Sequence, residues 1–329
     1  MMSRNILITG AAGYIRGSIV ANLLSKHPKT TKQQVFAAVR TDKQAKALST
    51  LGINVLKLDL SDEQAVVNEI SSQKVGVIVH AADSINPELA LLLIKALEKQ
   101  KESAGKPTYF IHTSGLSAFY ANSGWPRTVN KDTDAVFETE KEFADSYPIR
   151  KTDVMVIEHA QAQGVTPFVI VPSIVSIHIS DLTALYYRIV HAALKNEDIP
   201  SGKEGYYFAV AHEMDMWEFQ DHLAAAMKAR GLVSSDKPEV YPSDEFAAEA
   251  IDVPVEFLSA LYKSGGNFTA TRPQSIGWKP EWNKERFLKN VDVEIEDVIE
   301  LGKAKSSLID SLFAATMMHC SAVKAYSTY

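Results

Sequence analysis

The first half of the chain alternates short apolar segments with segments of helical spacing, and this alternation constrains the fold more than any other feature. Apolar or β-branched runs, which predict strands, occur at 5–9, 35–39, 54–57, 75–80, 108–113 and 168–171. Helical spacing occurs between most of them, at 14–25, 43–50, 62–71, 87–101 and 148–163. Strands that are apolar throughout are buried on both faces, as in a parallel sheet covered by helices. The pattern predicts an α/β fold with a doubly wound parallel sheet.

After Pro172 the regular alternation stops. The spacing predicts helices over 182–194, 216–230 and 293–324 and a strand over 206–211. We therefore expect a dinucleotide-binding domain over residues 1–175 and a smaller, mostly helical substrate lobe over 176–329, part of which can return to the sheet. The apolar segment 308–318 suits docking on the body or on a second subunit, so a homodimer stays open.

Composition excludes several classes of protein. The 329 residues carry a formal charge of −6, which does not favour binding to nucleic acid or to an anionic membrane. The single cysteine, Cys320, excludes an intramolecular disulfide framework and a multi-cysteine zinc site, and it fits a reducing compartment. No apolar run approaches the ~20 residues that span a bilayer. We expect a cytoplasmic protein without a metal centre.

A glycine-containing loop joins the first strand to the first helix. Gly10 and Gly13 allow a tight turn and a close approach of the backbone to a pyrophosphate, and Tyr14, Ile15 and Arg16 open the helix. The helix N-terminus supplies N–H groups and a positive dipole for the anion. In this strand–turn–helix context the loop predicts a dinucleotide site. The alternative is a turn that is merely structural.

The end of the second strand indicates which nicotinamide cofactor is bound. An acid there would accept a hydrogen bond from the ribose 2′-hydroxyl of NAD and repel the 2′-phosphate of NADP. This chain has Arg40, whose guanidinium can grip a phosphate. The sequence therefore favours NADP(H), although the nearby Asp42 leaves open that Arg40 is an ordinary solvated residue.

Further cofactor contacts are expected where the third and fourth strands end. Asp59, followed by Leu60, could accept a hydrogen bond from the adenine amino group. Ala81 and Ala82 are small residues where the dinucleotide would cross the sheet.

Together these residues resemble the extended, atypical short-chain dehydrogenase/reductase superfamily, including fungal-type epimerase/dehydratase-like and NmrA-like reductases of specialised metabolism. The resemblance covers most of the chain. It is carried by 9–17 (TGxxGxxG, with Arg16 in the last position), Asp59, 112–115 (HTSG), 147–151 (YxxxK), 171–172 (VP), 205–208 (GYYF) and 276–280 (IGWKP).

The resemblance implies a proton-transfer site. Tyr147 would donate a proton to a carbonyl or imine as hydride arrives from the nicotinamide. Lys151 would stabilise the phenolate and bind the nicotinamide ribose, and Ser114 would hydrogen-bond the substrate oxygen. Thr113 and Ser117 are alternatives to Ser114.

The resemblance also places Pro172 beside the cofactor, at the end of the next strand. Two departures from the family pattern bear on the site. Arg16 replaces the third glycine, and its side chain could swing toward the 2′-phosphate. Pro148 disfavours helical dihedrals at Tyr147, which weakens the expected Tyr147–Lys151 geometry.

Other chemistry-bearing residues have ordinary explanations. His80 and His112 are expected to be hydrogen-bonded core residues rather than metal ligands, and His178 is either a substrate contact or a loop residue. Aromatic residues at 119–125, and Tyr186 with Tyr187, could line a pocket or pack in the core.

The sequence thus predicts an NADPH-dependent reductase acting on a carbonyl or imine of a small organic molecule. Two alternatives stay open: a redox-neutral epimerase, dehydratase or cyclase on the same scaffold, and a non-catalytic dinucleotide sensor.

Overall fold

A parallel sheet forms the centre of the protein. The computed structural model describes residues 4–263 and 265–301. Within them, seven parallel strands lie in the order β3-β2-β1-β4-β5-β6-β7. They are β1 (Asn5–Thr9), β2 (Val35–Val39), β3 (Asn54–Lys57), β4 (Val75–His80), β5 (Tyr109–Thr113), β6 (Thr166–Pro172) and β7 (Tyr206–Ala209). The predicted doubly wound parallel fold is confirmed.

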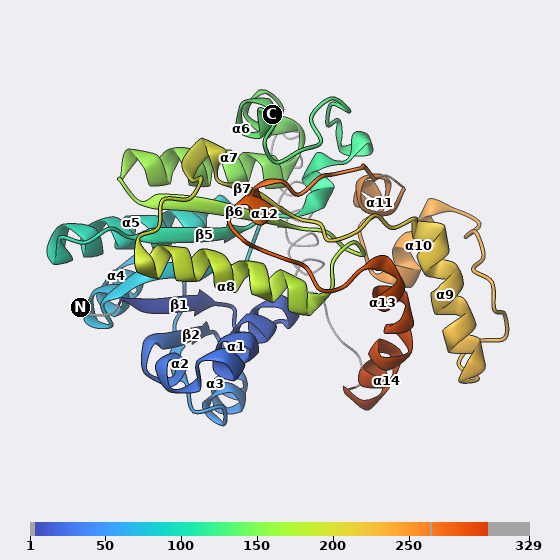
Figure 1. The fold of residues 1–329 in the computed structure, drawn as a ribbon, viewed down its shortest axis with the longest axis horizontal. Helices are drawn as coiled ribbons and strands as arrows, with labels where there is room; N and C mark the ends of the chain where they lie inside the picture. The colour runs from blue at the N-terminus through green and yellow to red at the C-terminus, as the bar shows by residue number, and fades with distance from the viewer. Residues whose placement is uncertain (1–3, 264, 302–329) are drawn as a thin grey trace, which may run out of the picture.

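Helices cover both faces of this sheet (Figure 1). One face carries α1 (Tyr14–Lys26), α2 (Pro28–Gln34), α3 (Asp42–Ser49) and α8 (Ile179–Lys195). The other carries α4 (Glu63–Ser72), α5 (Pro87–Ala104), α6 (Val136–Glu142) and α7 (Pro148–Ala162). Because successive residues of a strand point to opposite faces, each buried strand contributes apolar side chains to both layers.

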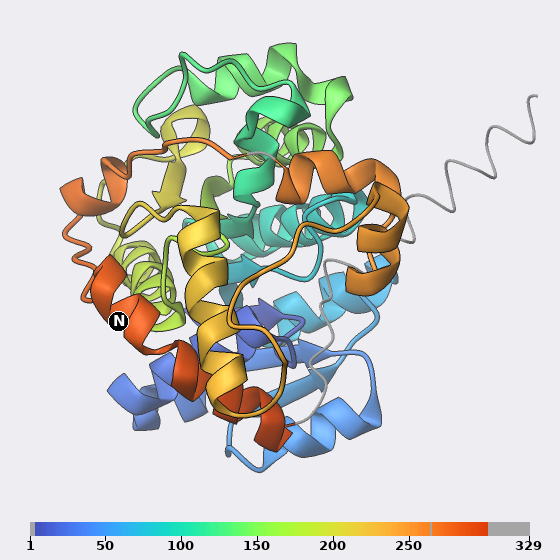
Figure 2. The ribbon, with the colours of Figure 1, turned by 90° about the vertical axis from the view of Figure 1, so that its right-hand side faces the viewer.

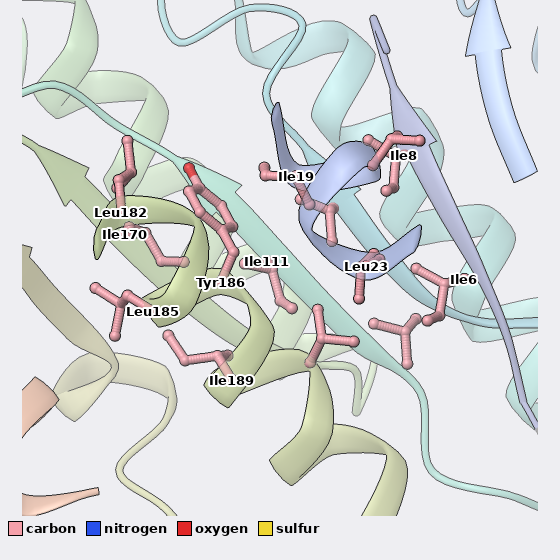
Figure 3. Close-up of a cluster of buried hydrophobic side chains, with 14 of the residues drawn as sticks. Ile6, Ile8, Ile19, Leu23, Ile111, Ile170, Leu182, Leu185, Tyr186 and Ile189 are labelled. Atoms are coloured by element: carbon pink, nitrogen blue, oxygen red, sulfur yellow. The ribbon is translucent and has the colours of Figure 1, made fainter. Parts of the chain in front are cut away.

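The layer formed by α1 and α8 shows how this packing works. In β1, Ile6 and Ile8 face α1 and α8, whereas Leu7 faces α4 and α5. Figure 3 shows Ile19 of α1 and Leu185 of α8 among the side chains packed between the two helices and the sheet. This packing fixes the first turn of α1 relative to the carboxyl ends of the strands.

Local signals explain where several helices begin and end. The Asp62 carboxylate accepts a hydrogen bond from Ala65 N and caps α4. Pro87 occupies the first turn of α5, which Gly105 ends with a left-handed backbone at φ 63°. At α3, the Thr41 hydroxyl and the Gln44 side chain form a reciprocal capping box.

The chain returns to the sheet beyond residue 175, through α8 and the edge strand β7. Of the helices that follow, α12 packs beside β7, and the others gather at the carboxyl ends of the strands (Figures 1 and 2). They are α9 (Met216–Ala229), α10 (Asp244–Ile251), α11 (Val255–Tyr262), α12 (Arg272–Ser275), α13 (Lys284–Lys289) and α14 (Val291–Leu301).

One buried carboxylate ties the lobe to α8. Asp181 accepts hydrogen bonds from Glu281 N (2.8 Å) and Trp282 N (2.9 Å), and its backbone carbonyl accepts one from the Trp278 indole. These hydrogen bonds fix the position of the lobe relative to α8 and the strand ends.

Two sequence expectations fall wholly or partly outside the described residues. The helix expected over 293–324 is described as α14 up to Leu301. The apolar segment 308–318 and Cys320 lie beyond that point. In the described part of the chain, no helix combines the length and the apolar character that crossing a membrane requires.

Candidate active site

The glycine loop has the geometry expected of an anion cradle. Gly10 has φ 64°, a left-handed conformation that favours glycine, and Gly13 precedes α1 with an extended backbone. No side chain caps the helix at Gly13, and the first turn of α1 carries no acid. The first N–H groups of α1 and its dipole are therefore oriented toward a negative group.

The side chain of Arg16, a residue of the first turn of α1, lies against this loop. A Cβ atom built on Gly10 would stand 2.1 Å from Arg16 Nη1, and one built on Gly13 would stand 2.8 Å from Nη2. The two glycines thus leave room for the guanidinium as well as for the turn. Burial lowers the pKa of Arg16, and the charge of the nearby Arg40 adds to that effect. A phosphate group at this position would relieve the repulsion between the two arginines.

The end of β2 carries a compensated acid and an exposed arginine. Asp42 forms an ion pair with Lys57 at 2.8 Å, so its charge is balanced within the loop. Arg40 is exposed and close enough to Asp59 to lower the pKa of that carboxyl. The arrangement suits a phosphate on the ribose better than a bare 2′-hydroxyl.

The other residues expected to contact the cofactor follow the carboxyl ends of the strands. Asp59 is exposed and accepts hydrogen bonds from Ser61 N (2.9 Å) and Ser61 Oγ (2.7 Å), which lower its pKa. The remaining positions are Tyr14 (exposed), Ile15 (half-buried), Leu60 (buried), Ala81 and Ala82 (half-buried) and Pro172 (half-buried).

Tyr147 and Ser117 form a buried hydroxyl pair. Tyr147 is 7% exposed, and its hydroxyl donates a hydrogen bond to Ser117 Oγ at 3.3 Å. Burial raises the pKa of Tyr147, whereas the hydrogen bond to Ser117 and the charge of Arg150 lower it in part. The phenol is therefore protonated at neutral pH, as a proton donor must be.

Lys151 does not join this pair. Its side chain is 56% exposed, and Nζ lies 3.0 Å from Asp145 Oδ1. The reason lies at Pro148, which begins α7 and leaves Tyr147 outside the helix with φ −152° and ψ 126°. Tyr147 and Lys151 consequently do not share one face of the helix as YxxxK implies.

Ser114 is also committed elsewhere. Its hydroxyl donates to Asp153 Oδ2 of α7 at 2.5 Å, and the residue is buried. A hydroxyl that donates to a carboxylate has no second proton to offer a substrate oxygen. Of the three hydroxyls that the sequence left open, Ser117 is the one that contacts Tyr147. Thr113 instead contacts the Tyr186 hydroxyl at 2.6 Å, on the opposite face of the sheet.

A row of polar side chains crosses the sheet next to Ser114. Thr9 of β1 pairs in register with His80 of β4, and His80 with His112 of β5. Thr9 Oγ1 lies 3.0 Å from His80 Nδ1, and His112 Nε2 lies 3.1 Å from Asp153 Oδ1. Burial and the neighbouring His112 lower the pKa of His80 to about 3. His80 thus has a hydrogen-bonding partner in Thr9, whereas His112 lies within ion-pair distance of Asp153 without a hydrogen bond. No metal-binding cluster occurs among the described residues.

The row continues to a buried acid of α6. Tyr206 of β7 pairs in register with Val169, which pairs with His112, and the Tyr206 hydroxyl donates to Glu140. Burial, and then the charge of Asp153, raise the pKa of Glu140 well above its usual range. Asp153 and Glu140 were not among the predicted site residues.

Most of the other candidate residues have structural roles. Phe119 and Trp125 pack edge to face in the core, 4.8 Å apart. His178 accepts a hydrogen bond from Ser180 N at the start of α8 and stacks on Trp282. Tyr187 contacts His27 at 2.6 Å.

A cavity of about 240 Å³ lies where the lobe meets the strand ends. Leu116, next to Ser117, lines it together with Ser176, Val210, residues 212–215 and residues 266–268. A larger hollow of about 590 Å³ lies near Gly105 and Gly164, at the end of the sheet where β5 and β6 begin. Ligands of open parallel sheets bind at the carboxyl ends of the strands, so we take the smaller cavity as the substrate site.

Comparison with known proteins agrees with this architecture. Residues 2–114 match the NmrA-like family. A search of curated proteins finds no match. Vestitone reductase from alfalfa (Medicago sativa) is 16% identical, with a TM-score of 0.55 over 91% of this chain and 99% of that one.

Two bacterial structures are similar to the same extent. An NADPH-dependent quinone oxidoreductase from Escherichia coli, complexed with NADPH, is 17% identical (TM-score 0.54, 88% of this chain and 99% of that one). A nucleoside-diphosphate-sugar epimerase from Staphylococcus aureus is 15% identical (TM-score 0.56, 88% and 99%). The chain therefore shares its fold with these two reductases and this epimerase, and its residues 2–114 match the NmrA-like family.

Proposed function

We propose that this protein is an NADPH-dependent reductase that transfers hydride to a carbonyl or imine of a small organic molecule. The observation that carries the proposal is the protonated, buried phenol of Tyr147, paired with Ser117, whose neighbour Leu116 lines the cavity at the strand ends. The NADPH-dependent quinone oxidoreductase from E. coli, which has this fold and is complexed with NADPH, supports it.

The residues around the glycine loop fit this cofactor. The Arg16 guanidinium lies where Cβ atoms on Gly10 and Gly13 would stand, and Arg16 and the first turn of α1 would meet the pyrophosphate. Arg40 would meet the 2′-phosphate. When bound there, NADPH supplies the hydride from C4 of its nicotinamide ring.

Tyr147 would supply the matching proton. At neutral pH the residue carries its proton, as donation during reduction requires. Ser117 accepts the hydrogen bond of the phenol hydroxyl and so fixes its direction.

Replacing Arg40 tests the cofactor assignment. We expect the protein to bind NADPH more tightly than NADH, and Arg40→Ser to weaken NADPH binding alone by about 1.5–3 kcal/mol, the value of a charge-assisted contact. Isothermal titration calorimetry with both cofactors measures the difference, and NADH serves as the internal control. Equal affinity of the unmodified protein for the two cofactors would contradict the assignment.

A labelled cofactor tests the reaction itself. NADPH deuterated at C4 is offered with a panel of ketones, aldehydes and imines. Net reduction requires one equivalent of NADPH oxidised per product and deuterium on the product carbon. Product formed while the NADPH absorbance stays constant would instead support the redox-neutral isomerase or dehydratase, the second candidate, whose fold the S. aureus epimerase shares.

The same experiment distinguishes an enzyme from a non-catalytic dinucleotide sensor. The displaced Lys151 removes part of the case against such a protein, because a sensor needs no Tyr–Lys pair. A sensor would bind NADPH in the titration yet oxidise none of it with any member of the panel.

A further inference from the structure

The cation expected beside Tyr147 is a different residue from the one that the YxxxK pattern indicates. Lys151 reaches into solvent toward Asp145, a carboxylate that is itself 89% exposed. An exposed ion pair of this kind has little influence on a buried phenol, because water screens its field.

Arg150 occupies the buried side of the same helical turn. The residue has no exposed surface, and all three of its guanidinium nitrogens donate hydrogen bonds. Nε donates to Ala118 O (2.7 Å), Nη1 to Ser146 Oγ (2.8 Å) and Nη2 to Ser123 Oγ (2.7 Å). Arg150 is therefore held in one position.

That position lies beside the ring of Tyr147. Arg150 Cζ lies 5.6 Å from the centre of this ring. Two of its hydrogen-bond partners adjoin the hydroxyl pair in sequence, since Ala118 follows Ser117 and Ser146 precedes Tyr147. The guanidinium thus connects the two segments that carry the hydroxyl pair, the turn after β5 and the start of α7.

We propose that Arg150, rather than Lys151, is the cation that positions Tyr147 and stabilises its phenolate. The inference rests on the proposed function, because it gives Tyr147 the role of proton donor. Donation breaks the Tyr147 O–H bond, forms an O–H bond on the substrate oxygen and leaves a phenolate. Water returns the proton before the next turnover. The guanidinium stabilises the phenolate during that interval.

The neighbouring ionisable groups leave this role to Arg150. Tyr120 lies close to Tyr147, but burial raises its pKa to about 12 and it stays neutral. Glu140 acts on Arg150 and not on Tyr147, and burial raises the pKa of Glu140 well above its usual range. Among the described residues, Arg150 is the charged group that acts on Tyr147.

A titration of Tyr147 alone tests the proposal without substrate or cofactor. A trifluorinated tyrosine, which ionises near neutral pH, is placed at position 147, and fluorine NMR follows its ionisation in the full chain. Lys151→Met is expected to leave the titration midpoint within about 0.3 pH unit of its value in the protein without this substitution. Arg150→Met is expected to raise the midpoint by about one unit or more, since a nearby opposite charge shifts a pKa by about 1–3 units. Arg150→Lys keeps the positive charge but loses the planar guanidinium and its three hydrogen bonds. Its midpoint is expected to lie between those of Lys151→Met and Arg150→Met.

The reverse order would overturn the proposal: a midpoint raised by Lys151→Met and unmoved by Arg150→Met. If Arg150→Met does not fold, Lys151→Met and Arg150→Lys decide, because a shift in Lys151→Met that exceeds the shift in Arg150→Lys overturns it equally. A failure of the proposed function gives a different result: the midpoints follow the expected order, yet no carbonyl or imine is reduced with NADPH.

Discussion

Tyr147→Phe is expected to lower turnover about 100–10,000-fold while leaving the affinity for NADPH nearly unchanged. The substitution removes the phenol proton and the hydrogen bond to Ser117, and it keeps the ring that packs among Leu116, Phe119 and Ile149. General-acid catalysis by a positioned side chain contributes an effect of this size. Steady-state rates with a reducible carbonyl, together with calorimetric NADPH titration, separate loss of chemistry from loss of binding.

Tyr120→Phe is the matched control, because Tyr120 is a second buried tyrosine of the same cluster. Turnover is expected to survive that change. Near-normal turnover in Tyr147→Phe would mean that another group donates the proton, and a collapse in Tyr120→Phe alone would identify Tyr120 as the donor.

The pH dependence of reduction follows from the same phenol. Tyr147 acts in its protonated form, which predominates below its pKa and is lost as the pH rises through that value. Because burial raises the pKa of Tyr147 above its ordinary value near 10, reduction is expected to show no loss from this group across neutral pH. An oxidation that used Tyr147 as its base would show the opposite trend.

Buried strands and their connections could be predicted from the sequence because each signal is local. The ends of β1, β2, β3 and β4 agree with the apolar runs, since a strand buried on both faces needs an unbroken apolar segment. Helix α2 was not predicted. Its sequence, PKTTKQQ, has no apolar periodicity, and it is anchored partly by the buried Thr31 hydroxyl, which donates to Leu23 O.

The glycine loop was also accessible from the sequence, because Gly10, Gly13 and Arg16 are neighbours along the chain. The proton-transfer half was less so. Whether Lys151 or Arg150 faces Tyr147 depends on the dihedral angles that Pro148 imposes, and a motif records spacing without direction.

The partner of Ser114 could not be predicted for a different reason. Asp153 comes 39 residues later, on α7, so their contact depends on how that helix packs against the sheet. One signal was available: His80 and His112 interrupt apolar strands at positions that become adjacent in the register. Polar residues in a fully buried row require partners, which here come from α6 and α7.

Removing the carboxylate at the centre of that row is expected to have the largest effect on stability. Asp153 has no exposed surface, and it contacts both Ser114 and His112. Asp153→Ala leaves the Ser114 hydroxyl and the His112 ring without this partner and opens a cavity beside them. Each buried polar group that is left without its partner costs about 1–3 kcal/mol, so the two groups together cost about 2–6 kcal/mol. The free energy of unfolding, measured by urea denaturation, is expected to fall by that amount.

Two variants separate this effect from a general sensitivity to lost carboxylates. Glu140→Gln replaces a second buried acid by its neutral isostere, and the amide keeps an acceptor for the Tyr206 hydroxyl, so a much smaller loss is expected. Asp145→Ala removes the exposed partner of Lys151 and is expected to change stability by no more than about 1 kcal/mol. A loss in Asp153→Ala no greater than that in Asp145→Ala would mean that water reaches Ser114 and His112 when the carboxylate is gone. The row would then be a hydrated channel at the edge of the site rather than part of a dry core.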